Sequence, residues 1–275
     1  MQDDFEMAPP GGESLTVEKA IANLQGDDPG LRYYAAWWLG KFRIATQEAI
    51  DALLAALEDK SCRTEDGGYP LQRNAARALG KLGNQKAVEP LIRCLNSEDY
   101  YVREAAAQSL QKLGARSSIP ALIKLLEGGV EAAVQVPGKP HLTQPYDAIL
   151  EALGSLNAKE AIPLIKPFIE HPVKRVQYAA ARAMYQLTGE AIYGEHLVQG
   201  LQGKELQLRR TALMDLGAIG YLPAAEAIAQ TQAENSLKII ALKGILEHQL
   251  KNNSLETSNL SDDAIRVMSL IDSLL

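Results

Sequence analysis

Apolar and small residues recur along the chain in one pattern. Each copy starts with a hydrophobic residue, continues with polar or aromatic positions and a pair of small residues, and closes on an apolar residue that Gly often follows. Seven copies are visible, with the closing residues Leu39, Leu79, Leu110, Leu153, Met184, Leu216 and Ile245. The apolar positions have the period of one face of an α-helix, and the alternation typical of a strand is absent. We therefore predict an all-α chain without a β-sheet.

A second amphipathic stretch precedes most copies and predicts the first helix of a helical hairpin. Examples are residues 49–57, 87–95, 118–126 and 161–169. Each hairpin has one apolar face per helix and cannot bury both faces alone, so successive hairpins must stack. The pattern predicts a HEAT-like α–α superhelix, a solenoid, over residues 13–250.

The two ends of the chain depart from this pattern. Residues 1–12 are polar and acidic, and we expect them to form a flexible N-terminus. Residues 251–275 are typical of a polar linker followed by a C-terminal helix. An apolar stripe at helical spacing in that helix consists of Ile265, Met268, Ile271 and Leu275. We expect the helix to cap the last repeat, with docking on a partner as the alternative.

Two steps of the repeat are longer than the others because residues are inserted between the first and the second helix. The insertions are residues 61–70 and 127–145. They occupy the same place in their repeats, so they should emerge on the same edge of the stack. Long irregular loops are usually binding elements, although a tolerated surface excursion is the alternative.

Two positions of each second helix should point away from the packing face, six and two residues before the closing residue. The first set is Tyr33, Arg73, Glu104, Asp147, Tyr178 and Arg210, and the second is Trp37, Arg77, Gln108, Glu151, Arg182 and Met214. The two members of a pair are four residues apart and share one helix face. We predict a ladder of aromatic, basic and acidic side chains along a groove. A solvated charged face is the alternative, but the aromatic group around Trp37 favours an interaction surface.

Composition narrows the possible functions. The formal net charge of −6 argues against nucleic-acid binding, which requires a basic surface. The two cysteines, Cys62 and Cys94, form neither a metal-binding nor a disulfide pattern, so we expect no metal site. We find no signal peptide and no membrane span, which predicts a cytoplasmic protein. Familiar enzyme motifs are also absent from the sequence.

Six segments carry a resemblance to a known family. They are RYYAAWWLG from Arg32, GGYPLQRNAARALGKLG from Gly67, YVREAAAQSL from Tyr101, PGKPHLTQPYDAILEALG from Pro137, VQYAAARAMYQLT from Val176 and LRRTALMDLGAIGYLPA from Leu208. These segments resemble the E-type subunit of the phycocyanobilin lyases that serve the α subunit of phycocyanin. The resemblance extends over residues 13–248 and includes both insertions, which generic HEAT repeats lack.

The resemblance implies an enzyme subunit that works as a heterodimer with a related F-type subunit. The pair would attach phycocyanobilin through a thioether to a cysteine of the phycocyanin α subunit, with the bilin as substrate and no cofactor. The alternatives are a noncatalytic scaffold or chaperone for phycobiliprotein assembly and a generic HEAT adaptor.

The implied reaction adds a cysteine thiol to the ethylidene group of the bilin A ring, and the nucleophile belongs to the acceptor protein. Cys62 and Cys94 therefore need not take part, because binding with acid–base assistance from either subunit would suffice. We expect the proton-transfer groups to be Tyr69, His141 and Tyr146. We expect the bilin-binding groups to be Arg73 and Arg77 for the propionates, Asp147 and Glu151 for the pyrrole N–H groups, and Tyr33 and Trp37 as an aromatic surface.

Overall fold

The computed structural model describes residues 15–253 and 260–275. The regular structure in these residues is helical, apart from one isolated bridge between Gln135 and Leu142. The prediction of an all-α chain is confirmed. Within the same residues, no helix combines the length and the apolar character needed to cross a membrane. The expected flexible N-terminus, residues 1–12, lies outside the described residues.

Within the described residues, the helices pair into seven hairpins that match the seven repeat copies. The first helices are α1 (Val17–Gln25), α3 (Gln47–Glu58), α5 (Val88–Cys94), α7 (Ile119–Lys124), α10 (Ile162–Ile165), α12 (Ala191–Gly200) and α14 (Ala225–Gln230). The second helices are α2 (Pro29–Lys41), α4 (Pro70–Leu82), α6 (Tyr100–Lys112), α9 (Tyr146–Ser155), α11 (Lys174–Thr188), α13 (Leu206–Ile219) and α15 (Asn235–Asn253). Outside the hairpins are α8 (Gly129–Ala132) in the second insertion and α16 (Asp262–Asp272) near the C-terminus.

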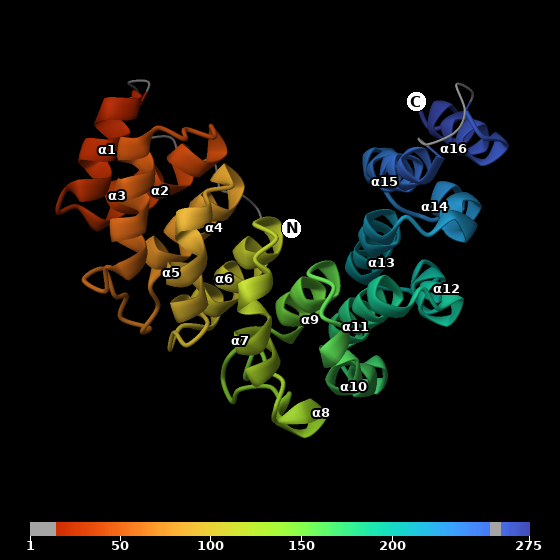
Figure 1. Cartoon of the computed structure of the whole chain (residues 1–275), viewed down its shortest axis with the longest axis horizontal. Helices are drawn as coiled ribbons and strands as arrows, with labels where there is room; N and C mark the ends of the chain where they lie inside the picture. The colour runs from red at the N-terminus through yellow and green to blue at the C-terminus, as the bar shows by residue number, and fades with distance from the viewer. Residues whose placement is uncertain (1–14, 254–259) are drawn as a thin grey trace. The chain divides into compact units, whose positions relative to one another are not determined.

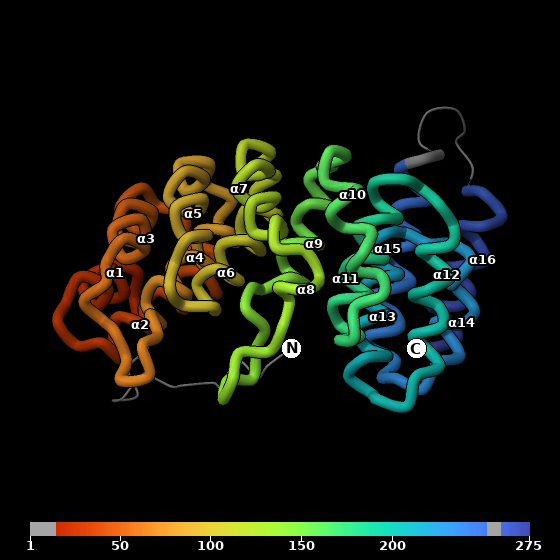
Figure 2. The backbone as a smooth tube through the Cα atoms, turned by 90° about the horizontal axis from the view of Figure 1, so that it is seen from below, coloured from red at the N-terminus to blue at the C-terminus, as the bar shows by residue number. Residues whose placement is uncertain are grey.

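The chain divides into two compact units, a division that the repeat pattern does not predict. Unit 1 contains the residues up to Leu125 together with Ala133–Ala152, and unit 2 contains Leu126–Ala132 together with Leu153–Leu275. In unit 1, α3, α5 and α7 form one row of helices, while α2, α4 and α6 form a second row (Figure 2). The closing leucines of these second helices are fully buried, so the repeat motif supplies the core of the unit.

In unit 2, the second helices α11, α13 and α15 lie next to one another, with α12 and α14 packed along them (Figure 1). The C-terminal helix α16 packs on α14 and α15, so it caps the last repeat as expected. The predicted apolar stripe is not the face that packs. The helix buries Ala264 and Val267, whereas Ile265, Met268 and Leu275 are exposed and Ile271 is half-buried. Ala264 and Val267 share one helix face, and their small side chains allow a close approach to the last hairpin.

The second helices of unit 1 approach one another closely at glycines. A Cβ atom on Gly40 would lie 2.8 Å from Cα of Ala78 in α4, and one on Gly80 would lie 2.9 Å from Cα of Ser109 in α6. Oγ of Ser109 also donates a hydrogen bond of 2.8 Å to the carbonyl oxygen of Ala76. A side chain at either glycine would push the helices apart. The glycine that ends the repeat motif therefore sets the spacing between neighbouring repeats.

Candidate functional site

Residues from both insertion loops are bonded to the start of α6, on one edge of unit 1. From the first loop, Tyr69 donates its backbone N–H to Oδ2 of Asp99 at 2.7 Å. From the second loop, the backbone carbonyl of Thr143 accepts a hydrogen bond of 2.9 Å from Nη2 of Arg103. The prediction that the two insertions emerge on the same edge is confirmed.

Asp99 and Arg103 fix the geometry of this edge. Asp99 is the N-cap of α6, and its Oδ1 accepts the N–H of Tyr101 at 2.8 Å while its Oδ2 holds the first loop. Arg103 donates from Nη1 to the carbonyl oxygen of Ser97 at 2.6 Å, in addition to its bond to the second loop. One turn of α6 therefore positions both loops.

His141 lies in the second loop with its ring held in a defined orientation. The ring stacks on Tyr100, with centroids 4.1 Å apart and planes inclined by 12°, and meets the edge of Tyr101 at 5.8 Å. Nδ1 lies 2.9 Å from the carbonyl oxygen of Leu142. Because a carbonyl oxygen only accepts hydrogen bonds, Nδ1 of the neutral ring carries the proton and Nε2 carries the lone pair. The half-buried imidazole therefore offers a basic nitrogen in a fixed position.

Tyr100 and Tyr101 contact the ring of His141, and further aromatic and basic side chains lie at the same edge of unit 1. We call this group the α6 cluster, and it consists of Tyr69, Arg73, Tyr100, Tyr101, Arg103 and His141. The guanidinium carbon of Arg73 lies 5.7 Å from the ring centroid of Tyr101, and that of Arg103 lies 6.0 Å from the centroid of Tyr100. Burial lowers the pKa of Arg103. Tyr100, Tyr101 and Arg103 are not among the predicted site residues. Their signal was a Tyr-Tyr pair after a capping Asp, in the repeat between the two insertions.

Tyr69 and Tyr146, the other two predicted proton-transfer groups, are buried. Their exposed fractions are 7% and 2%. The ring of Tyr69 lies beneath the guanidinium of Arg63 at 5.7 Å, and Oη of Tyr146 is 3.3 Å from Oγ1 of Thr143. Of the three predicted groups, His141 is therefore the most accessible.

The predicted ladder of unit 1 is only partly available to a ligand. Tyr33, Trp37 and Arg73 are half-buried, and Arg77 is exposed. Nη2 of Arg77 lies 3.6 Å from Oε2 of Glu104, so the charges of two neighbouring second helices neutralise each other. Arg77, predicted to bind a propionate, already has a carboxylate beside it.

Two ladder positions that should point away from the packing face are buried, with exposed fractions of 6% for both Asp147 and Tyr178. Asp147 belongs to the start of α9, where residues 145–150 are all buried. Tyr178 in α11 fills the space beside Gly200 of α12, where a Cβ atom would lie 2.9 Å from the tyrosine Oη. The predicted exposure is wrong at both positions. Glu151, one turn after Asp147, is half-buried and more accessible.

In unit 2, charged ladder positions form ion pairs between helices. Nη1 of Arg182 in α11 lies 3.0 Å from Oδ1 of Asp215 in α13, and the two side chains are 15% and 5% exposed. Arg210 pairs with Glu234 in the following repeat. Arg182 and Asp215 therefore link consecutive second helices instead of lining a surface.

The two cysteines are free thiols in buried positions. Burial, followed by the negative charge of Glu58, raises the pKa of Cys94 to about 12. Sγ of Cys62 lies 3.2 Å from Nη1 of Arg32. The described part of the chain contains no group of three His, Cys, Asp or Glu residues that could hold a metal ion.

Comparison with known proteins identifies the family. The chain is 67% identical over 264 residues to the phycocyanobilin lyase subunit alpha of Nostoc sp. (strain PCC 7120), covering 96% of this chain and 95% of that protein. It is 64% identical over 266 residues to the phycocyanobilin lyase subunit alpha of Microchaete diplosiphon, covering 95% and 90%. The chain belongs to the phycocyanobilin lyase alpha-subunit family.

The repeat architecture agrees with membership of the phycocyanobilin lyase alpha-subunit family. HEAT repeats match residues 62–135, and the PBS lyase HEAT-like repeat matches residues 31–59. A chain in the solved complex of CpcE and CpcF of phycocyanin lyase from Nostoc sp. PCC7120 is 66% identical, with a TM-score of 0.91 and coverage of 98% of both chains. The predicted HEAT-like fold and the resemblance based on six segments are both confirmed.

Proposed function

We propose that this chain is the alpha, or E-type, subunit of a heterodimeric lyase that attaches phycocyanobilin through a thioether to a cysteine of the phycocyanin α subunit. The observation that carries the proposal is the match over nearly the whole chain to the lyase subunit solved together with CpcF. The partner is then the related F-type subunit. The bilin is a substrate, not a resident cofactor, and the reaction takes place in the cytoplasm.

The α6 cluster is the best-formed place for acid–base assistance. The reaction adds the S–H bond of the acceptor cysteine across the ethylidene double bond, so the thiol must lose its proton while the bilin gains one. Nε2 of His141 is positioned to accept the thiol proton, because the hydrogen bond at Nδ1 and the stacking on Tyr100 fix the ring. The guanidinium groups of Arg73 and Arg103 favour the thiolate that results.

The other predicted residues take supporting roles in this proposal. The buried Tyr69 and Tyr146 hold the two loops rather than exchange protons with a ligand. Glu151 is the more accessible carboxylate for the pyrrole N–H groups, with Asp147 one turn earlier in the same helix. Tyr33 and Trp37 supply aromatic surface on α2 for the bilin rings.

Reconstitution tests the proposed function. Purified chain, F-type partner, phycocyanobilin and apo phycocyanin α subunit should give covalent attachment, seen by absorbance and by mapping the modified cysteine. Leaving out this chain should abolish attachment at that cysteine. If the F-type subunit alone achieved the same rate and site, the enzymatic role would be lost in favour of the noncatalytic scaffold.

We expect that neither thiol of this chain takes part in the reaction. A variant with Cys62→Ser and Cys94→Ser should attach the bilin at a rate within about twofold of the unchanged chain, because the nucleophile belongs to the acceptor. The measurement is the initial rate of attachment, with circular dichroism to check folding. A folded variant that had lost attachment, or a bilin trapped on Cys62 of the unchanged chain, would contradict the expectation.

A further inference from the structure

A lysine occupies the same position in three successive repeats. It lies two residues after the closing residue, at Lys41, Lys81 and Lys112. The four later copies have Ser155, Gln186, Ala218 and Glu247 at that position. The lysines therefore form a column that is confined to α2, α4 and α6 of unit 1, in a chain whose net charge is negative.

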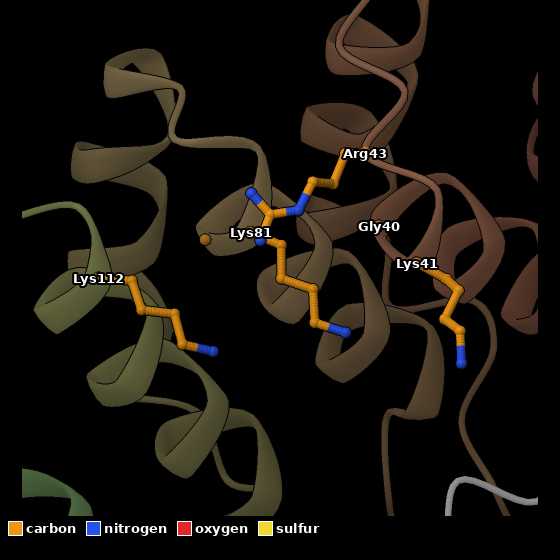
Figure 3. A pocket seen from close by; sticks show the side chains of 6 residues that line it. Gly40, Lys41, Arg43, Lys81 and Lys112 are labelled. Atoms are coloured by element: carbon orange, nitrogen blue, oxygen red, sulfur yellow. The ribbon is translucent and has the colours of Figure 1, made fainter. Parts of the chain in front are cut away.

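The three lysines line one pocket together with Arg43. This basic pocket has a volume of about 450 Å³ and is completed by Gly40 and Gly80. Figure 3 shows the three lysine side chains extending from successive helices toward the same side. The close approach of the helices at Gly40 and Gly80 is what brings consecutive lysines into a single pocket.

The cations of the basic pocket have no carboxylate partner among the described residues, in contrast to Arg77, which pairs with Glu104. Desolvation, followed by the charges of Lys81 and Arg77, lowers the pKa of Lys112. Lysines at helix C-termini are favoured by the helix dipole. That reason does not apply to Arg43, which lies beyond α2 with a left-handed backbone at φ 54°. Four like charges in one pocket repel one another, and an anion would relieve this cost.

An aromatic surface borders the basic pocket on α2. Nζ of Lys41 lies 5.4 Å from the ring centroid of Trp37, one helical turn away. The ring centroids of Trp38 and Phe42 are 4.9 Å apart, and Phe42 is 56% exposed. A ligand that fits here carries negative charges on an extended aromatic body.

We propose that the basic pocket holds the two propionate carboxylates of the open-chain tetrapyrrole, while the aromatic surface of Trp37 and Phe42 receives its rings. This proposal rests on the proposed function and deepens it. The sequence predicted Arg77 as a propionate-binding group, but Glu104 neutralises its charge. The proposal instead assigns the propionates to Lys81, one helical turn further along α4, and to the neighbouring lysines. Successive helices are about 10 Å apart, so propionates on adjacent pyrrole rings reach two neighbouring lysines.

The test removes positive charge from the pocket and, separately, negative charge from the ligand, and compares the effects on binding to the purified heterodimer. The pocket variant is Lys81→Met with Lys112→Met. The matched control is Lys86→Met with Lys124→Met, which removes two exposed lysines from the same unit. Each protein is titrated with phycocyanobilin and with its dimethyl ester, which lacks the two negative charges, and binding is followed by absorbance.

The pocket variant should bind the free acid about 10-fold to 100-fold more weakly, because two charge-assisted contacts are lost. The ester should bind the unchanged heterodimer weakly. Its affinity should fall by less than about threefold in the pocket variant, because removing the lysines and removing the propionate charges abolish the same contacts. The control variant should bind both ligands as the unchanged heterodimer does.

Equal affinity of the unchanged heterodimer for acid and ester would overturn the proposal while leaving the lyase function intact. So would a pocket variant that binds the bilin normally but loses affinity for the apo phycocyanin α subunit, which would make the pocket a protein-docking surface. A heterodimer that neither binds nor attaches the free acid would refute the proposed function itself, and the propionate site with it.

Discussion

Replacing Asp215 by alanine should lower the free energy of unfolding by about 3 to 5 kcal/mol, because the change removes a buried carboxylate from the largely desolvated guanidinium of Arg182. The pair links α11 to α13, and only 5% of the Asp215 side chain is exposed. Removing one partner costs more than the pair contributes, since the desolvated charge remains. Urea denaturation of the full chain, followed by circular dichroism, measures the loss.

Glu58→Ala provides the control for an exposed ion pair. Glu58 pairs with Arg93 at 2.5 Å, but the two side chains are 53% and 61% exposed. This change should cost no more than about 1 kcal/mol. The combined change of Arg182→Met and Asp215→Leu should recover most of the stability lost in Asp215→Ala, because no buried charge remains. Equal costs for Asp215→Ala and Glu58→Ala would argue against a buried pair.

His141→Phe should reduce the rate of thioether formation by about 100-fold or more at neutral pH, while heterodimer formation stays intact. Phenylalanine keeps a flat ring that can stack on Tyr100 but removes Nε2, the proposed proton acceptor. Single-turnover attachment to the apo phycocyanin α subunit measures the rate, and bilin titration measures affinity separately.

His141→Ala distinguishes chemistry from loop structure. If the imidazole transfers a proton, the phenylalanine and alanine variants should be similarly slow. If the ring only holds the second loop, the phenylalanine variant should be nearly as fast as the unchanged chain and the alanine variant slow. Fast attachment with phenylalanine would remove His141 from the proton-transfer step.

The repeats and both insertions were predictable because they depend on local rules. A helix that buries one face needs apolar residues at helical spacing, and an insertion changes the length of a repeat step. The exposure of single ladder positions was not predictable, since it depends on residues elsewhere in the chain. Tyr178 is buried because Gly200 leaves room for its ring, and Asp147 is buried because the start of α9 is covered.

The α6 cluster could be predicted only in part for a similar reason. Tyr69 bonds to Asp99 across 30 positions, and Arg103 bonds to Thr143 across 40 positions. The Tyr-Tyr pair after Asp99 is visible in the sequence, but the loop residues that bond to this turn of α6 are not. The lysine column is different, because aligning the copies two residues past the closing position displays Lys41, Lys81 and Lys112 directly. The predicted ladder contained only positions before the closing residue, so it did not include this column.

The contacts at the start of α6 join the two insertions into one structural unit. The loops belong to the second and fourth repeats, but both are anchored on the third, through Asp99 for one loop and Arg103 for the other. A chimaera that receives one loop without the third repeat lacks the Asp99 or Arg103 side chain that binds this loop. The backbone groups of the loop that bond to these side chains are then left without their partners. Transplanting the edge into another helical array therefore requires moving the three repeats as one block, and insertions or deletions in either loop should be tolerated only where these two anchors survive.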